Sequence, residues 1–94
     1  MALSIQHQAQ DQQFTTSQDG NSAELAYSRP SDGVIDFTHT FVEEDLRGQG
    51  IGEELAKTGL AYARDENLQV RTTCTFMRDY VAQHLEYQDL LEKN

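Results

Sequence analysis

Hydrophobic and polar residues alternate along the first half of the chain, which is the pattern of half-buried β-strands. Three segments show it clearly: 13–17, 23–27 and 34–42. Asp19-Gly20-Asn21 predicts a hairpin turn between the first two segments, because Gly and Asn tolerate positive φ. A second turn is expected at Arg29–Gly33, which holds the only proline. The pattern therefore predicts a three-stranded antiparallel meander.

The third of these segments carries a candidate functional residue. Its alternation predicts one face that carries the side chains of Ile35, Phe37, His39 and Phe41. The opposite face would carry Asp36, Thr38 and Thr40. His39 is then expected to share a face with two aromatic residues.

The glutamine-rich segment 1–12 can be interpreted in two ways. Leu3, Ile5 and His7 alternate, which is typical of a short edge strand. A frayed terminus fits the same composition equally well. The meander thus has three or four strands.

A helical period replaces the alternation after the third strand. We expect a helix over 50–66, with Ile51, Leu55 and Tyr62 on its apolar face. Gly59 lies on the same face, where glycine costs about 1 kcal/mol relative to alanine. Its presence predicts close packing against the sheet. Asn67 can end this helix in a left-handed conformation.

The remaining residues predict a strand and a second helix. Segment 68–73 is short and contains Val70, which indicates a strand parallel to segment 34–42 by the usual crossover rule. A helix is expected over 75–85, with a last helical turn over 87–91. Residues 1–94 are therefore predicted to form one small α/β (α+β) domain, in which 37% apolar residues supply a limited core.

Charge and cysteine content restrict the possible partners and the compartment. The net charge of −9 argues against binding to nucleic acid, which needs a basic surface, and permits a cationic partner. Solubility is the other explanation of this charge. Cys74 is the only cysteine, which fits a reducing compartment. The N-terminal residues lack the pattern of a secretory signal, and no segment is long enough to span a membrane. A cytoplasmic protein is expected.

Three of the six glycines, Gly48, Gly50 and Gly52, lie between the third strand and the first helix. Such a turn lets backbone N–H groups approach an anion at the helix N-terminus. A P-loop is excluded, because Gly52 is followed by Glu53 rather than by Lys and Ser or Thr. A dinucleotide fingerprint also fails, because its third small residue would be Glu53 or Leu55. A phosphate-bearing ligand bound in some other way remains the hypothesis.

The spacing Arg47-x-x-Gly50-x-Gly52 resembles the Gln/Arg-x-x-Gly-x-Gly/Ala motif with which GCN5-related N-acetyltransferases bind the acyl-CoA pyrophosphate. Further segments resemble the minimal branch of that family, of roughly a hundred residues. They are Asp19-Gly20, Ala23-x-Leu25-x-Tyr27, His39-Thr40-x-Val42, Leu46 to Gly52, Cys74-x-Phe76 and His84-x-Glu86-Tyr87. The resemblance covers residues 13–91.

Two positions depart from the pattern of the branch. Thr72 and Leu85 stand where that branch often has proline, which affects the loop around the cysteine more than the fold. The chain also lacks the C-terminal strands and much of the amine-side wall of longer family members. The resemblance implies a GNAT-like fold but no particular acceptor.

The resemblance implies that acetyl-CoA is the co-substrate. Its pyrophosphate would be wrapped by the turn and the helix start, which comprise Arg47, Gly48, Gln49, Gly50, Ile51 and Gly52. Val42 would end a strand that separates from its neighbour and would bind the pantetheine arm. Without the resemblance, Val42 could equally be a buried strand residue.

Cys74 and His39 are the candidate catalytic residues. A cysteine that follows a strand and precedes a helix can carry an activated thiolate and could accept the acetyl group. The alternative is a small buried hydrophobic residue. His39 could act as a base, or simply be a hydrogen-bonded sheet residue. His84 could contact ligand. The three histidines and Cys74 show no ligand spacing, so no metal is expected.

The sequence therefore predicts an N-acetyltransferase that transfers acetyl from acetyl-CoA to an amine, which we expect to be cationic. The alternative is a non-catalytic acyl-CoA-binding or regulatory module that has kept the CoA site. A plain interaction domain with a Gly-rich turn is a third reading.

Overall fold

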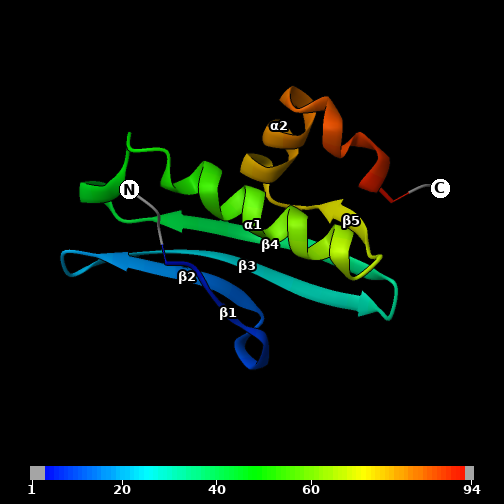
Figure 1. Cartoon of the computed structure of the whole chain (residues 1–94), viewed down its shortest axis with the longest axis horizontal. Helices are drawn as coiled ribbons and strands as arrows, with labels where there is room; N and C mark the ends of the chain where they lie inside the picture. Colours follow the sequence, from blue (N-terminus) through cyan, green and yellow to red (C-terminus); the bar gives the residue numbers. More distant parts are fainter. Residues whose placement is uncertain (1–3, 93–94) are drawn as a thin grey trace.

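The computed structural model describes residues 4–92 as a five-stranded sheet with two α-helices on one face (Figure 1). The strand order is β1-β2-β3-β4-β5, and the first four strands are antiparallel. The strands are β1 (Gln6–Gln8), β2 (Gln13–Gln18), β3 (Asn21–Ser31), β4 (Val34–Val42) and β5 (Gln69–Thr72). The helices are α1 (Ile51–Asp65), α2 (Thr75–Gln83) and the short 3₁₀ helices η1 (Ala9–Asp11), η2 (Glu44–Leu46) and η3 (Leu85–Leu90). The predicted meander is confirmed.

The hairpin between β2 and β3 differs in detail from the prediction. Positive φ falls on Asp19 (53°) and Gly20 (82°), and Asn21 is already the first residue of β3. This is the geometry of a two-residue turn whose twist matches that of the strands. Asp19 therefore adopts positive φ in place of Asn21, because Asn21 pairs with Gln18 in the ladder.

The second turn is shorter than predicted. β3 continues to Ser31, so only Asp32 and Gly33 connect it to β4. Pro30 lies inside β3, between the paired positions Ser28 and Ser31, where the register of the ladder shifts. Proline has no N–H to donate, and an irregularity in the ladder is where a strand tolerates it.

The alternation predicted for the third strand is wrong beyond Phe37. Ala26 pairs with His39 and Tyr27 pairs with Phe37, so Thr38 is an extra residue, a β-bulge, on β4. A one-residue insertion exchanges the two faces for all residues that follow. Thr40 pairs with the buried Leu25 and therefore lies on the core face, together with Val42. His39 and Phe41 are exposed on the outer face.

At the N-terminus, the structure has the edge strand rather than the frayed segment. Leu3 lies outside the described residues, but β1 pairs with β2 over three residues. The ring of His7 stacks on Phe14 with a centroid distance of 4.3 Å, and its Nε2 lies 2.6 Å from the hydroxyl of Tyr27. This aromatic contact attaches β1 to the sheet.

Helix α1 packs along the sheet through the face that was predicted. A Cβ added at Gly59 would lie 2.9 Å from side-chain atoms of both Leu25 and Phe37. The helix axis therefore lies too close to β3 and β4 for any larger residue, which confirms the packing role of Gly59. Asn67, with φ of 57°, follows the helix in the predicted left-handed conformation.

The segment after α1 completes the sheet on the β4 side, where β5 pairs with β4 and α2 packs against both strands. β5 pairs in parallel with β4, as predicted, and α2 buries Met77 and Val81. The predicted helix over 75–85 is two residues too long, because α2 ends at Gln83 and Leu85 is an exposed residue of η3. The last described residues lie beside β5, where Glu92 pairs with Arg71 at 2.8 Å. Within residues 4–92, no helix combines the length and apolar character that a membrane crossing requires.

Candidate functional site

The Gly-rich turn leads into α1 through two left-handed residues. Gly48 has φ of 80° and Gly50, the N-cap of α1, has φ of 78°. Only glycine adopts this conformation without strain. The first helical hydrogen bond runs from Glu54 N to Gly50 O, and no side chain caps the helix. The amide groups of residues 51–53 are therefore left without helical acceptors at a positively polarised helix end.

A cavity of about 300 Å³ opens at this helix end. It is lined by Val42, Leu46, Arg47, Gly48, Gly50, Ile51, Gly52, Glu53 and Phe76. Phe76 comes from α2 and forms the wall opposite Gly52, since a Cβ at Gly52 would lie 3.1 Å from the end of the Phe76 ring. The cavity thus has a polar end of backbone amides and an apolar wall.

The two polar side chains of the turn hold its backbone in shape. Arg47 Nε donates to the carbonyl oxygen of Val42 at 3.0 Å, and Gln49 Nε2 donates to the carbonyl oxygen of Asp45 at 3.0 Å. Arg47 lines the cavity and has further N–H donors on its guanidinium. Gln49 does not line the cavity. The structure therefore places Arg47 at the cavity and Gln49 behind the turn.

Strand β4 has two neighbours along its first half and one along its second half. The ladder with β5 covers only Val34–Phe37, and Cys74 N then donates to Phe37 O at 2.8 Å. Among residues 4–92, segment 38–42 is paired with β3 on one edge and with no strand on the other. This free edge leads from Val42, at the cavity, toward Cys74. Val42 therefore lies beyond the end of the pairing between β4 and β5, and its predicted contact with a pantetheine arm stays a prediction.

Cys74 lies at the inner end of this free edge. It is the N-cap of α2 and is 9% exposed, and its Sγ lies 3.2 Å from Thr40 Oγ1. Thr40 and Val42 project from the same face of β4, two residues and about 7 Å apart. The Cys74 thiol therefore lies beside Thr40, two residues along β4 from Val42 at the cavity. Thr40 could not be assigned to this contact from the sequence, because the bulge at Thr38 is not visible there.

A buried carboxylate fixes the loop that carries Cys74. Asp36 is 8% exposed and accepts hydrogen bonds from Thr73 N at 3.2 Å and from Thr73 Oγ1 at 2.8 Å. Together with the bond from Cys74 N to Phe37 O, these contacts hold residues 73 and 74 against β4. The position of the thiol is thus determined by β4 on both sides of the bulge.

The histidines do not gather at this site. His39 lies on the outer face of β4, opposite the face that carries Thr40 and Cys74. His84 stacks on the ring of Tyr80 at 3.9 Å, with its Nδ1 2.7 Å from Tyr80 O. His7 contacts β2 and β3, and burial lowers its pKa. No group of three potential metal ligands occurs within residues 4–92. The base role predicted for His39 thus finds no support in the geometry.

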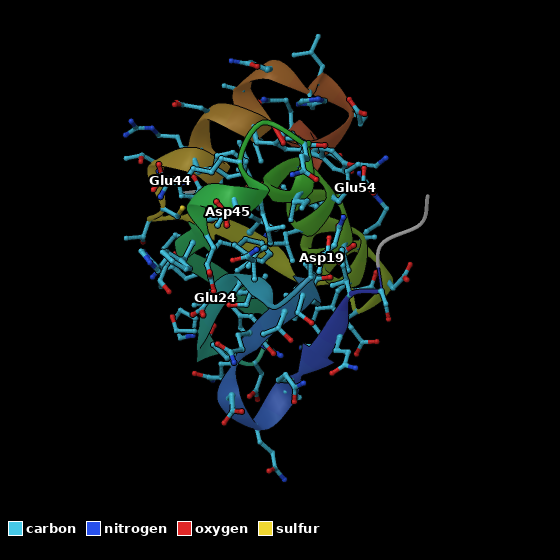
Figure 2. All side chains as sticks on the ribbon, turned by 90° about the vertical axis from the view of Figure 1, so that its left-hand side faces the viewer. Asp19, Glu24, Glu44, Asp45 and Glu54 are labelled. Carbon is cyan, nitrogen blue, oxygen red and sulfur yellow. The ribbon has the colours of Figure 1, made fainter. Side chains whose placement is uncertain are left out.

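Acidic side chains surround the end of the molecule at which the Gly-rich turn lies. Figure 2 views this end and labels five of them, which come from the β2–β3 turn, β3, η2 and α1. They are Asp19, Glu24, Glu44, Asp45 and Glu54. Glu53 even lines the cavity, where Arg47 is the basic residue. An anion in the cavity would depend on Arg47 and the local amides, against an unfavourable surrounding field.

A model of the GCN5-related N-acetyltransferase family matches residues 13–90, which include both the Gly-rich turn and Cys74. The chain therefore belongs to this family, and its resemblance to the minimal members is confirmed.

Individual relatives agree with this assignment. The chain is 31% identical over 84 residues to Protein NATD1 of Homo sapiens and of Mus musculus, matching 87% of this chain and 74% and 76% of those proteins. It also resembles the NMR solution structure of a GCN5-like candidate N-acetyltransferase from Staphylococcus aureus. The TM-score is 0.77 at 30% identity, covering 98% of this chain and 90% of that chain. The predicted GNAT-like fold is thereby confirmed.

Proposed function

We propose that the protein binds acetyl-CoA in the cavity at the start of α1 and transfers the acetyl group to an amine. The observation that carries this proposal is the uncapped helix end. Residues 51–53 offer amide donors beside two left-handed glycines, and Arg47 adds a cation. A pyrophosphate group is the anion for which such a helix end is suited. Family membership adds that proteins of this fold generally use acetyl-CoA.

The residues of the free edge suit the rest of such a ligand. Beyond Phe37, β4 has no strand partner on the side away from β3, although the Val42 carbonyl accepts a hydrogen bond from Arg47. Amide-containing chains bind well to an unpaired strand edge. Phe76 supplies an apolar wall beside Val42. The thioester end would then be directed along β4 toward Thr40 and Cys74.

Two chemical routes are compatible with this arrangement. In the covalent route, the Cys74 thiolate attacks the thioester carbonyl, the CoA thiolate leaves, and an amine then attacks the acetyl-cysteine. The Cys74 thiolate then leaves, and the nitrogen loses a proton to give the amide. In the direct route, a neutral amine attacks the bound thioester, the CoA thiolate leaves, and the nitrogen loses a proton. Cys74 is the side chain next to Thr40 on the free edge, whereas His39 lies on the other face, so the geometry favours Cys74.

The proposed acceptor is a cationic amine. The net charge is −9, and the end of the molecule that contains the cavity carries the acidic residues labelled in Figure 2. Such a field concentrates cations at the site. Nucleic acid is not an expected partner, because its phosphates would be repelled.

Two measurements test the function. Calorimetry with CoA should give saturable binding to the full chain. Transfer of isotope-labelled acetyl from acetyl-CoA should then be measured over a pool of diamines, basic peptides and basic proteins. Binding without transfer to any of them would support the alternative described next, and failure to bind CoA would contradict both.

The alternative is a non-catalytic module that binds acyl-CoA and acts through a partner. The observation in its favour is the burial of Cys74, which is only 9% exposed, together with the outward position of His39. Acetyl-CoA without acceptor would leave such a protein unmodified. The covalent route would instead leave an adduct of about 42 Da, one acetyl group by formula mass.

A further inference from the structure

The ladder between β4 and β5 ends in an irregular way. At its start, Gln69 N donates to Gly33 O at 2.8 Å, and the parallel pairing then runs as far as Phe37. The hydrogen bonds of a parallel ladder are evenly spaced, so the same offset would place Thr73 N on the carbonyl oxygen of Phe37. In the structure, Cys74 N occupies that position instead, at 2.8 Å. The chain therefore holds one residue too many at the point where β5 leaves the sheet.

The extra residue is Thr73, and the side chain of Asp36 binds it. The Thr73 amide donates to Asp36 Oδ1 at 3.2 Å, and the Thr73 hydroxyl donates to Asp36 Oδ2 at 2.8 Å. A carboxylate only accepts hydrogen bonds, so its two oxygens match these two donors. Asp36 is 8% exposed, and a carboxylate at such depth is costly unless it is hydrogen-bonded. Asp36 thus replaces the backbone acceptor that a regular ladder would offer to Thr73.

This irregularity has two consequences for the candidate site. The chain turns from β5 into α2 and does not continue beside segment 38–42, as can be followed in Figure 1. Cys74 is also placed so that its Sγ lies 3.2 Å from Thr40 Oγ1. If Thr73 took its regular place on Phe37, Cys74 would be shifted by one residue, and a shift of one residue exchanges the faces of a strand. The free edge of β4 and the place of the thiol therefore have one common origin.

We propose that Asp36 is a positioning residue of this site. By holding Thr73 out of the ladder, its carboxylate keeps the edge of segment 38–42 open for the acyl donor and sets the Cys74 thiol beside Thr40. The identity of the donor rests on the proposed function, whereas the contacts that carry the proposal lie within the chain. Asp36 acts through residues 73 and 74 and does not itself touch the donor.

Two substitutions of Asp36 separate its hydrogen bonds from its charge. In Asp36→Asn, the amide group offers an oxygen to the Thr73 amide and an N–H to the Thr73 hydroxyl, whereas Asp36→Val offers neither. Glu24→Val is the matched control, because it removes a carboxylate from the same outer face of the sheet.

Thr73→Val is a milder test of the same contact. Thr73 is exposed, and the substitution removes only the bond from its hydroxyl to Asp36. Thr75→Val, at the exposed first residue of α2, is the control for this variant.

Two measurements on the full chain test the proposal. Hydrogen exchange followed by NMR compares the Cys74 amide with the amide of Leu25 in the central strand β3, and calorimetry gives the affinity for CoA. In Asp36→Val, the Cys74 amide should exchange at least about tenfold faster relative to Leu25, and CoA affinity should fall at least about fivefold. Thr73→Val should change both in the same direction by about fivefold, as expected for one hydrogen bond. Asp36→Asn and the two controls should stay within about twofold of the parent.

A role in overall stability alone would accelerate exchange at Leu25 and Cys74 equally, and that result would overturn the proposal. Parental affinity for CoA in a folded Asp36→Val would overturn it as well. If Asp36→Val does not fold, Thr73→Val decides by the same two readings. If exchange at Cys74 responds as expected but the parent does not bind CoA, Asp36 still positions the thiol and the proposed acetyltransferase function fails.

Discussion

At the scale of single residues, the site depends on positions where the backbone or a neighbouring ring leaves no choice of side chain. Gly50 is one, because its φ of 78° strains any residue with a Cβ. Gly52 is another, because Phe76 occupies the space beside it. Thr40 matters for a different reason, because its hydroxyl lies 3.2 Å from the sulfur of Cys74. Gly52 and Thr40 allow a substitution whose effect on the site can be separated from its effect on folding.

Gly52→Val should abolish CoA binding while the domain stays folded. The new side chain would meet Phe76, whose ring end lies 3.1 Å from the position of its Cβ, and would fill the cavity. Gly50 is less suitable, because a substitution there also strains the backbone. The matched control is Gly33→Ala, which has open space around its Cβ and no positive φ. Calorimetry with CoA and circular dichroism should separate the two variants. CoA binding by Gly52→Val at parental affinity would place the site elsewhere.

Thr40→Val should slow alkylation of Cys74 at fixed pH by about fivefold, the equivalent of one hydrogen bond of about 1 kcal/mol. The thiolate would lose the hydroxyl 3.2 Å from its sulfur. Thr15→Val, on the outer face of β2, serves as the control. The rate would be followed by mass spectrometry with a small thiol reagent, in the presence and absence of CoA. Equal rates in both variants would show that Thr40 has no influence on the thiol.

At the scale of elements, the sequence predicted what regular periodicity determines and missed what a single irregular residue determines. The alternation of Ala23, Leu25 and Tyr27 corresponds to a buried face of β3. The Thr38 bulge has no signature in composition, because its cause is the pairing with β3, and it reversed the prediction for His39. The glycine turn was predictable because glycine itself is the signal. The Thr40–Cys74 contact was not, because it joins segments whose relative position only the fold defines.

Gly59→Ala should destabilise the protein, although alanine favours helix by about 1 kcal/mol. The added methyl would lie 2.9 Å from atoms of Leu25 and Phe37, so the helix must move from the sheet. Overpacking of this kind costs about 1–3 kcal/mol. Urea unfolding should therefore give a lower midpoint, with Lys57→Ala on the exposed side of α1 as control. A midpoint higher than that of the parent would indicate that α1 can shift at no cost.

Docking of β1 should weaken as the pH falls below 6.5, the usual pKa of histidine. Burial lowers the pKa of His7 in the folded protein below its usual 6.5. The unfolded chain therefore binds more protons in this range, so the stabilisation is present above the unfolded pKa and is lost as the pH falls through the folded pKa. Hydrogen exchange of the β1 and β2 amides should accelerate at acid pH. His7→Phe should keep the stacking on Phe14 and make this exchange less dependent on pH. An equally strong dependence in that variant would exclude His7 as the cause.

At the scale of the whole molecule, the two substrates of the proposed reaction need opposite charges on the protein. The phosphates need cations, which Arg47 and the helix end supply locally. A cationic acceptor is favoured by the remaining surface, with its net charge of −9. The acidic balance follows from the composition, and the place of Arg47 in the turn was expected from the family resemblance. What the fold adds is the cavity that Arg47 lines.

Acetyl transfer to a cationic acceptor should weaken as the salt concentration rises, because exposed charges are screened over about 10 Å at 0.1 M salt. The KM for the acceptor should increase between about 0.02 and 0.5 M salt. The KM for a neutral amine acceptor should change little. Efficient transfer to an acidic acceptor, independent of salt, would contradict the proposed role of the surface charge.

The bulge at Thr38 has a consequence for how this strand can vary in evolution. Between Phe37 and His39, β4 holds one residue more than β3, and this extra residue has no partner in the ladder. Deleting Thr38 would bring His39 next to Phe37 and restore regular alternation, so Thr40 and Val42 would stay on the core face and His39 and Phe41 on the outer face. Loss of this codon is therefore expected to be less damaging than loss of the codon for Phe41, which would turn Val42 away from the cavity, and a deletion library read by CoA binding would measure the difference. Homologous chains with one residue fewer between Phe37 and Thr40 should therefore keep the same two faces.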